Sequence, residues 1–129
     1  MPHRDVLLVV ETSKQYGRGL LKGIGRYAFT RGNWSIYLEE RSLHERLPAW
    51  VKHWRGDGVI VRSNSKRMVQ TLLRTGKPVV ETDPKVTEYH LPFVYTDDHA
   101  IARLAVEHFL QRGFREISYC SLMRTRWSA

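Results

Sequence analysis

At 129 residues the chain is long enough for one domain with a buried core and too short for two, and no apolar run approaches the roughly 20 residues that a membrane span requires. The hydrophobic share of 42% is that of a globular protein, and a start without a signal-peptide pattern together with a single cysteine favours a cytoplasmic location. The net charge of +8 comes from lysines and arginines spread along the chain and not interleaved with aromatic residues, which favours a solvated surface over a nucleic-acid interface.

The first predicted strand covers residues 6–10, where five consecutive apolar residues suit a strand that is buried on both faces of a parallel sheet. A polar break at 11–14 follows, and then an amphipathic pattern predicts a helix over 17–30. Strand, polar loop and helix in this order form the first half of a β-α-β unit. Because ligands in such folds bind beyond the carboxyl ends of strands, residues 11–18 are the first candidate site.

Three of the glycines in or directly after this helix carry an expectation about its structure. Gly32 is expected to end the helix in the left-handed conformation that glycine favours. Gly23 and Gly25 each cost up to about 1 kcal/mol relative to alanine inside a helix, so we expect a compensating close approach to the sheet or to a second subunit.

Four further strands are predicted where short apolar or alternating runs follow turn residues, at 34–39, 59–61, 79–81 and 116–120. Helices are predicted between them, at 48–54, at 66–73 after an N-cap at Ser65, and after an N-cap at Asp97 or Asp98. Residues 83–92 carry no period and are expected to be irregular, while 93–96 are expected to pair at a sheet edge. This alternation predicts an α/β fold with a doubly wound, mostly parallel five-stranded sheet.

The last helix has the clearest apolar stripe, which predicts that one of its faces is buried. The stripe consists of Ile101, Leu104, Ala105, His108 and Phe109. On this stripe His108 is interpreted as a core residue, and Cys120, at the end of an apolar run, as a small buried hydrophobe.

No pattern in the sequence supports catalysis. No histidine pair has metal-ligand spacing, and neither a phosphate-binding loop, a dinucleotide fingerprint nor a serine-nucleophile elbow is present. The sequence therefore predicts neither an enzyme nor a bound metal or cofactor.

Polar residues instead gather at the predicted carboxyl ends of three strands. They are Ser13, Lys14, Tyr16 and Arg18 after the first strand, Arg62, Ser63 and Asn64 after the third, and Asp83 after the fourth. Hydroxyl, amide and carboxylate groups can pair with sugar hydroxyls, and a tyrosine ring can cover the apolar face of a sugar. Each residue taken singly is better explained as a solvated loop or cap residue, but the set together favours a binding cleft.

Several of these segments resemble the sensor domain of lac-repressor-type regulators. The features are Asp97-Asp98, a helix with Ala105 and His108-Phe109, the turn Gly113-Phe114 and the apolar strand after it. Residues 11–27, 54–60 and 124–128 resemble the xylose operon regulators more narrowly.

The resemblance implies a periplasmic-binding-protein-like domain whose two lobes close on a sugar, with D-xylose or a related pentose as the effector. It also implies a homodimer and a helix-turn-helix module for operator DNA, which these residues do not contain. Residues 1–129 would then be the N-terminal lobe, ending before the second lobe. The resemblance also implies that Asp83 contacts the sugar, because it stands where many members of the family have a sugar-binding aspartate. It implies that the loop 13–18 belongs to the binding site, without assigning contacts to its single residues.

Two alternatives stay open. One is a transport-type sugar-binding protein, which the missing signal peptide disfavours. The other is a flavodoxin-like or receiver-like signalling domain, although a receiver should have several acidic residues after the first strand and only Glu11 stands there.

Overall fold

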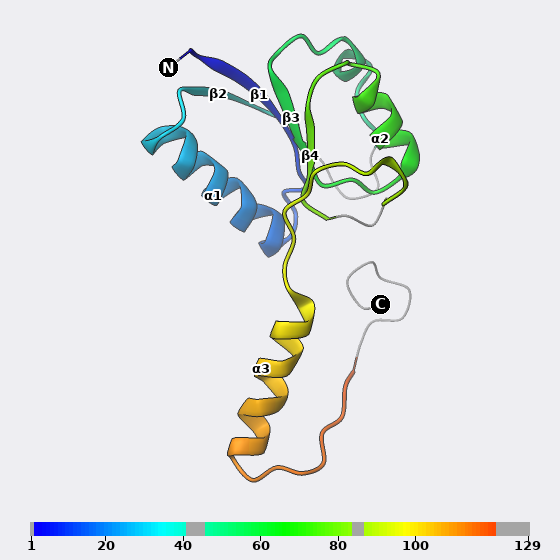
Figure 1. The fold of residues 1–129 in the computed structure, drawn as a ribbon. Coiled ribbons are helices and arrows are strands. Elements are labelled where there is room, and N and C mark those ends of the chain that lie inside the picture. The colour runs from blue at the N-terminus through cyan, green and yellow to red at the C-terminus, as the bar shows by residue number, and fades with distance from the viewer. Residues whose placement is uncertain (1, 41–45, 84–86, 121–129) are drawn as a thin grey trace. The chain divides into compact units, whose positions relative to one another are not determined.

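The computed structural model describes residues 2–40, 46–83 and 87–120 (Figure 1). The chain divides into two compact units, residues 1–95 and 96–129. The first unit carries the sheet and the predicted binding residues, and the second carries the last helix.

A parallel sheet of four strands in the order β2-β1-β3-β4 forms the centre of the first unit. The strands are β1 (Arg4–Val9), β2 (Trp34–Leu38), β3 (Gly58–Val61) and β4 (Val79–Glu81). β1 is flanked on both sides, which is why its run of apolar residues is buried. The predicted α/β class and parallel sheet are confirmed, and the strand ends agree with the predictions to within two residues.

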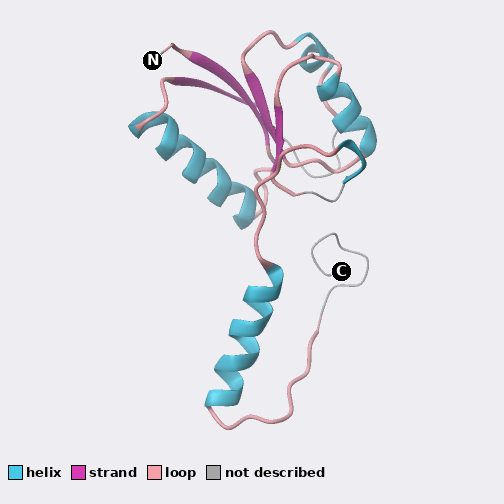
Figure 2. Ribbon diagram, in the orientation of Figure 1, coloured by secondary structure: helices cyan, strands magenta, loops and turns pink. Residues whose placement is uncertain are grey.

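The helices cover both faces of this sheet (Figures 1 and 2). The chain leaves β1 for β2 through α1 (Gln15–Thr30), and leaves β3 in the opposite direction for β4 through α2 (Lys66–Leu73). Right-handed crossovers in opposite directions place α1 on one face and α2, with the short helix η1 (Ala49–His53), on the other.

The core of the first unit lies between the sheet and the α2 face. It is formed by Leu7, Val9, Val51, Val59, Val61, Met68, Leu72 and Val79. The predicted N-cap of α2 is confirmed, since the Ser65 hydroxyl accepts a hydrogen bond from the Met68 backbone N–H at 3.3 Å.

α1 begins at Gln15, two residues before the predicted start, and ends at Thr30 as predicted. The expected left-handed conformation at Gly32 is wrong: the glycines with positive φ are Gly76 (+67°) and Gly113 (+85°). Instead, a Cβ at Gly32 would lie 3.2 Å from the Trp34 ring, so glycine serves close packing at this turn.

The glycines inside α1 do not pack closely against the sheet. A Cβ on Gly23 or Gly25 would have no atom within 4 Å. The expected compensation by contact with the sheet is therefore wrong, because α1 turns this side away from the rest of the unit. A contact with a second subunit stays a prediction.

The irregular segment before the second unit contains the short helix η2 (Thr87–Tyr89). Phe93 forms an isolated parallel bridge with Glu81, so part of the predicted edge pairing at 93–96 is present. This bridge adds backbone pairing beside β4 at one position but does not form a fifth strand.

The second unit contains α3 (Asp98–Gln111), and Asp97 caps it by accepting the Ala100 N–H at 2.9 Å. No residue of α3 is buried by the described residues of its own unit, so the predicted burial of its stripe is not found within this unit. His108 is exposed and contacts Arg112 at 3.0 Å, and Cys120 is exposed as well. Within this unit the stripe has no second layer to pack against.

The predicted fifth strand is also not found. Residues 116–120 have no strand pairing and are exposed. Alternation predicts a strand only where a neighbouring strand supplies the backbone hydrogen bonds, and the described part of the second unit contains none. Among the described residues, no helix has the length and apolar character needed to cross a membrane.

Candidate ligand-binding site at the carboxyl ends of the sheet

The switch point of the fold lies between β1 and β3, because the chain leaves these neighbouring strands in opposite directions. In open α/β sheets, ligands bind in the crevice outside the carboxyl ends of the strands at this point. Glu11 follows β1, and Arg62 follows β3, where its backbone N–H still donates to the Val9 carbonyl at 2.9 Å. Both side chains are therefore held at the expected place by the pairing of the strands.

Three charged side chains form a buried cluster at this edge. Arg62 Nη1 lies 2.8 Å from Glu11 Oε2, and Arg62 Nε lies 3.5 Å from Asp83 Oδ2. Glu11, Arg62 and Asp83 are 2%, 8% and 5% exposed. Removal of such charges from water is costly, so each of them depends on its partners for compensation.

A second buried carboxylate organises the backbone beyond β4. Glu81 Oε1 accepts the N–H groups of Ser63, Thr82 and Asp83 at 3.0, 2.9 and 2.9 Å. One carboxylate therefore fixes both the start of the loop after β3 and the turn after β4. This contact sets the direction in which the Asp83 side chain leaves the backbone.

Tyr16 closes the cluster from the first turn of α1. Its ring lies under the Arg62 guanidinium, with Cζ 4.5 Å from the ring centroid, and its hydroxyl donates to the Thr82 carbonyl at 3.3 Å. The ring is 37% exposed, so part of its surface remains in contact with solvent. Gly17 lets the helix come this close, because a Cβ there would collide with the Glu11 carbonyl oxygen.

Two buried polar atoms of the cluster have no hydrogen-bond partner among the described residues. They are Ser63 Oγ and Asp83 Oδ1. An unsatisfied buried polar atom costs about 1–3 kcal/mol, and more when it is charged. A bound water molecule or a ligand hydroxyl can form the hydrogen bonds that such atoms lack.

The other predicted residues lie around this centre. The Ser13 hydroxyl donates to Glu11 Oε1 at 3.0 Å, whereas Arg18 holds the carbonyls of Thr12 and Ser13. Lys14 is the exposed N-cap residue of α1 and has no side-chain capping bond. The structure thus brings Ser13, Tyr16, Arg62, Ser63 and Asp83 together. Arg18 supports the loop backbone, and Lys14 and the half-buried Asn64 lie beside the cluster in sequence.

Sequence reasoning placed Glu11 inside the candidate region 11–18 without naming it as a site residue, and it did not identify Glu81 and Thr82. The available signal was a carboxylate placed directly at the end of an apolar strand, at Val10-Glu11 and at Val80-Glu81. A charge at such a position is almost never buried without a partner. The described residues contain no group of histidine, cysteine or carboxylate side chains arranged to hold a metal ion.

A doubly wound parallel sheet with a buried polar cluster at its switch point is the architecture in which α/β domains commonly bind ligands. The family model described as the XylR N-terminal domain matches residues 5–103, and the chain belongs to this family. The match agrees with the resemblance found in the sequence, and it excludes the flavodoxin-like and receiver-like alternatives.

Curated relatives support the same assignment. The chain is 28% identical over 137 aligned residues to the xylose operon regulatory protein of Escherichia coli K12, covering 98% of this chain and 33% of that protein. It is 22% identical over 122 residues to the protein of the same name from Haemophilus influenzae, covering 91% of this chain and 31% of that protein. The chain thus spans about a third of the length of these relatives, which are named as regulatory proteins of a xylose operon. No solved structure gave a significant match.

Proposed function

We propose that this chain is the N-terminal lobe of the sensing domain of a cytoplasmic, sugar-responsive transcription regulator. The observation that carries the proposal is the pair of buried, unpartnered atoms at the switch point, Ser63 Oγ and Asp83 Oδ1. A sugar hydroxyl can donate to the carboxylate oxygen and exchange a hydrogen bond with the serine hydroxyl, which satisfies both atoms.

The remaining groups suit a sugar of small size. The exposed part of the Tyr16 ring offers an apolar surface next to the polar atoms, the combination on which sugar rings bind. Arg62 is held between Glu11 and Asp83, so it orients the aspartate and does not need to contact the sugar. Because the relatives are named for a xylose operon, D-xylose or another pentose is the first ligand to test.

The signal is proposed to pass through a second lobe that these residues do not contain. The sugar binds the closed arrangement of the lobes more tightly than the open one, and so shifts the population towards closure. Closure changes the spacing of paired helix-turn-helix modules on operator DNA. Only this differential affinity can bias the regulator, whatever the absolute affinity for the sugar.

A homodimer is the proposed oligomeric state, with the solvent-facing side of α1 as the contact. Phe29 is 93% exposed, and the open space around Gly23 and Gly25 allows another helix to approach closely. Light scattering should give the mass of two 15.1 kDa chains, and Phe29→Glu should return the mass of one. A single-chain mass for the unchanged protein at high concentration would exclude this contact.

The first experiment is a thermal-shift screen of the chain with D-xylose, D-ribose, L-arabinose and D-glucose. A ligand at one hundred times its dissociation constant stabilises the folded state by about 2.7 kcal/mol, which raises the melting temperature by several degrees. A shift with D-xylose and none with the other three sugars is the expected result. No shift with any sugar contradicts binding by this lobe alone.

Two serine variants then separate a ligand contact from a structural role. Ser63→Ala removes an unpartnered hydroxyl, so it should leave the melting temperature without sugar unchanged or higher while abolishing the sugar-induced shift. Ser65→Ala removes the N-cap of α2, so it should lower stability by about 1 kcal/mol and keep the sugar-induced shift. If Ser63→Ala keeps the full shift, its hydroxyl is not a sugar contact.

A further inference from the structure

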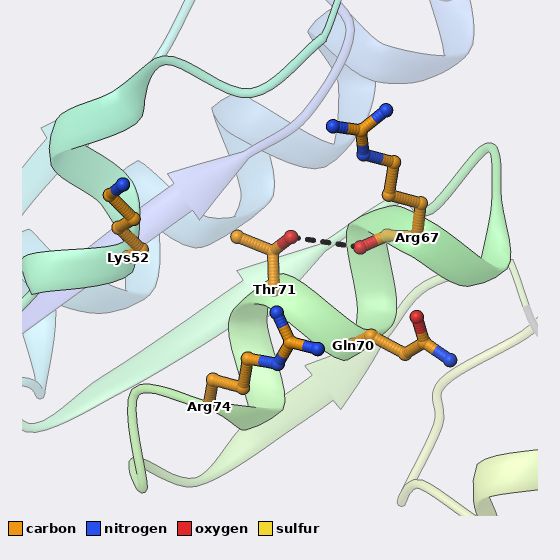
Figure 3. A pocket seen from close by; sticks show the side chains of 5 residues that line it. All are labelled: Lys52, Arg67, Gln70, Thr71 and Arg74. Atoms are coloured by element: carbon orange, nitrogen blue, oxygen red, sulfur yellow. Dashed lines mark hydrogen bonds between the residues drawn. The ribbon is translucent and has the colours of Figure 1, made fainter.

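A basic pocket lies between η1 and α2 and shares no residue with the sugar site. It has a volume of about 530 Å³ and is lined by Lys52, Arg67, Gln70, Thr71 and Arg74. Figure 3 shows the Lys52 ammonium on the η1 side and the guanidinium groups of Arg67 and Arg74 on the α2 side, with Thr71 between them. Two separate elements therefore contribute three cations to the lining of one hollow.

A neighbouring hollow extends the same positive surface. It also measures about 530 Å³, shares Lys52 and Arg74 with the first pocket, and adds Arg55 and Lys77 to the lining. Neither lining includes an aspartate or a glutamate. The shared pair, Lys52 and Arg74, is thus the centre of a continuous cationic surface.

The cations of this pocket are not neutralised by ion pairs within the described part of the chain. Other surface cations do form ion pairs. Lys66 Nζ lies 2.6 Å from Glu88, and Arg4 Nη1 lies 3.4 Å from Asp57. The described residues place no carboxylate within ion-pair distance of Lys52, Arg67 or Arg74. Like charges held together without counter-charges repel one another, and a bound anion relieves this repulsion.

The neutral groups of the lining are already held in place. Gln70 Nε2 donates to the Tyr89 hydroxyl at 2.8 Å, and the Thr71 hydroxyl donates to the Arg67 carbonyl at 2.9 Å. Because these two groups already donate their hydrogen bonds within the protein, the cations are the groups of the pocket that can recognise a ligand. A guanidinium presents paired N–H donors that match phosphate oxygens, and an ammonium adds a point charge.

We propose that this pocket binds the phosphate group of a small molecule, either inorganic phosphate or a phosphorylated sugar. A concave site of this volume suits a small ligand, and its charged lining excludes an apolar one. Duplex DNA is the competing occupant, because its phosphates bind cationic surfaces in general, and the test below includes it. The chain would then bind an anion at a second site, separate from the proposed sugar site.

The test measures binding by isothermal titration calorimetry at fixed ionic strength, because exposed charges are screened by salt. The probes are inorganic phosphate, D-ribose 5-phosphate, D-ribose and a 20-base-pair DNA duplex. We expect a dissociation constant of about 1 mM or tighter for at least one phosphate probe and no binding of D-ribose at this pocket. Stronger binding of the sugar phosphate identifies a phosphorylated metabolite as the ligand, and equal binding identifies phosphate itself.

A matched pair of double variants locates the site. K52Q/R74Q removes the two cations shared by both hollows, and should weaken phosphate binding about tenfold or more. K22Q/R31Q removes one exposed lysine and one exposed arginine from α1 and its C-cap, and should leave phosphate binding unchanged. Circular dichroism checks that both variants fold. Equal losses in both variants, no binding of either phosphate probe, or DNA as the only probe bound would each overturn the proposal.

Discussion

Arg62 Nη1 lies 2.8 Å from Glu11 Oε2, and both side chains are almost fully buried. The two residues are 51 positions apart in the chain, and the pairing of β1 with β3 brings them together. This ion pair joins the carboxyl ends of the two strands that flank the switch point. Because Arg62 also contacts Asp83 and the Tyr16 ring, it joins side chains that follow β1 and β4 to one at the start of α1.

Replacement of Arg62 should therefore destabilise the fold strongly. Arg62→Gln leaves the carboxylates of Glu11 and Asp83 buried without a cation, and removal of one partner of a buried pair costs about 3–5 kcal/mol. The measurement is the urea midpoint of unfolding at pH 7. Arg18→Gln is the control, because Arg18 is exposed and contacts only loop carbonyls, so it should cost about 1 kcal/mol or less. Equal midpoints for the two variants would contradict the role of the buried pair.

Glu81 should be as important for stability although no sequence motif marks it. Glu81→Ala leaves the N–H groups of Ser63, Thr82 and Asp83 without their acceptor, which should cost roughly 3 kcal/mol or more. Hydrogen exchange should accelerate at these three amides relative to the amides of β1. Glu40→Ala, on the exposed loop after β2, should change neither the urea midpoint nor the exchange rates. Unchanged protection of the three amides would exclude Glu81 as their acceptor.

The first four strands were predictable because their signals are local. Residues 6–10 form an uninterrupted apolar run, and turn residues precede β3 and β4 at Gly56-Asp57-Gly58 and Lys77-Pro78. The same reasoning failed at 116–120, because a strand also requires a paired neighbour, which is not a property of its own sequence. Burial of the α3 stripe likewise requires another layer, and the described part of the second unit supplies none.

The candidate site was predictable as a place but not as a network. Topology alone locates residues after strand ends, which is how Ser63 and Asp83 were found. The partnership of Glu11 with Arg62 depends on strand register, and that of Glu81 with three N–H groups depends on the turn after β4. Neither is encoded in the spacing of residues along the chain.

Two glycine-to-alanine variants in α1 should have opposite effects on stability. Gly17→Ala places a methyl group against the Glu11 carbonyl oxygen and should destabilise the fold despite the higher helix propensity of alanine. Gly23→Ala adds a methyl group in open space and should stabilise the helix by up to about 1 kcal/mol. The free energy of unfolding from urea titration at low protein concentration measures both. Two shifts of the same sign would mean that the start of α1 does not pack on the end of β1 as described.

Asp57 should make stability depend on pH in the acid range. Its carboxylate accepts the Asp5 N–H at 2.8 Å and pairs with Arg4, and these contacts, the backbone hydrogen bond above all, lower the pKa of Asp57 below its ordinary value of 3.8. A lowered folded-state pKa stabilises the protein above the ordinary pKa, and this contribution is lost as the pH falls through the folded-state value. Asp57→Asn should therefore lower the melting temperature at pH 7, and its deficit relative to the unchanged protein should shrink as the pH falls below about 4. Glu107→Gln, on the exposed surface of α3, is the charge-matched control and should show no such deficit at pH 7. A deficit for Asp57→Asn that stays constant from pH 7 to the acid limit would show that the carboxylate charge is not what stabilises this turn.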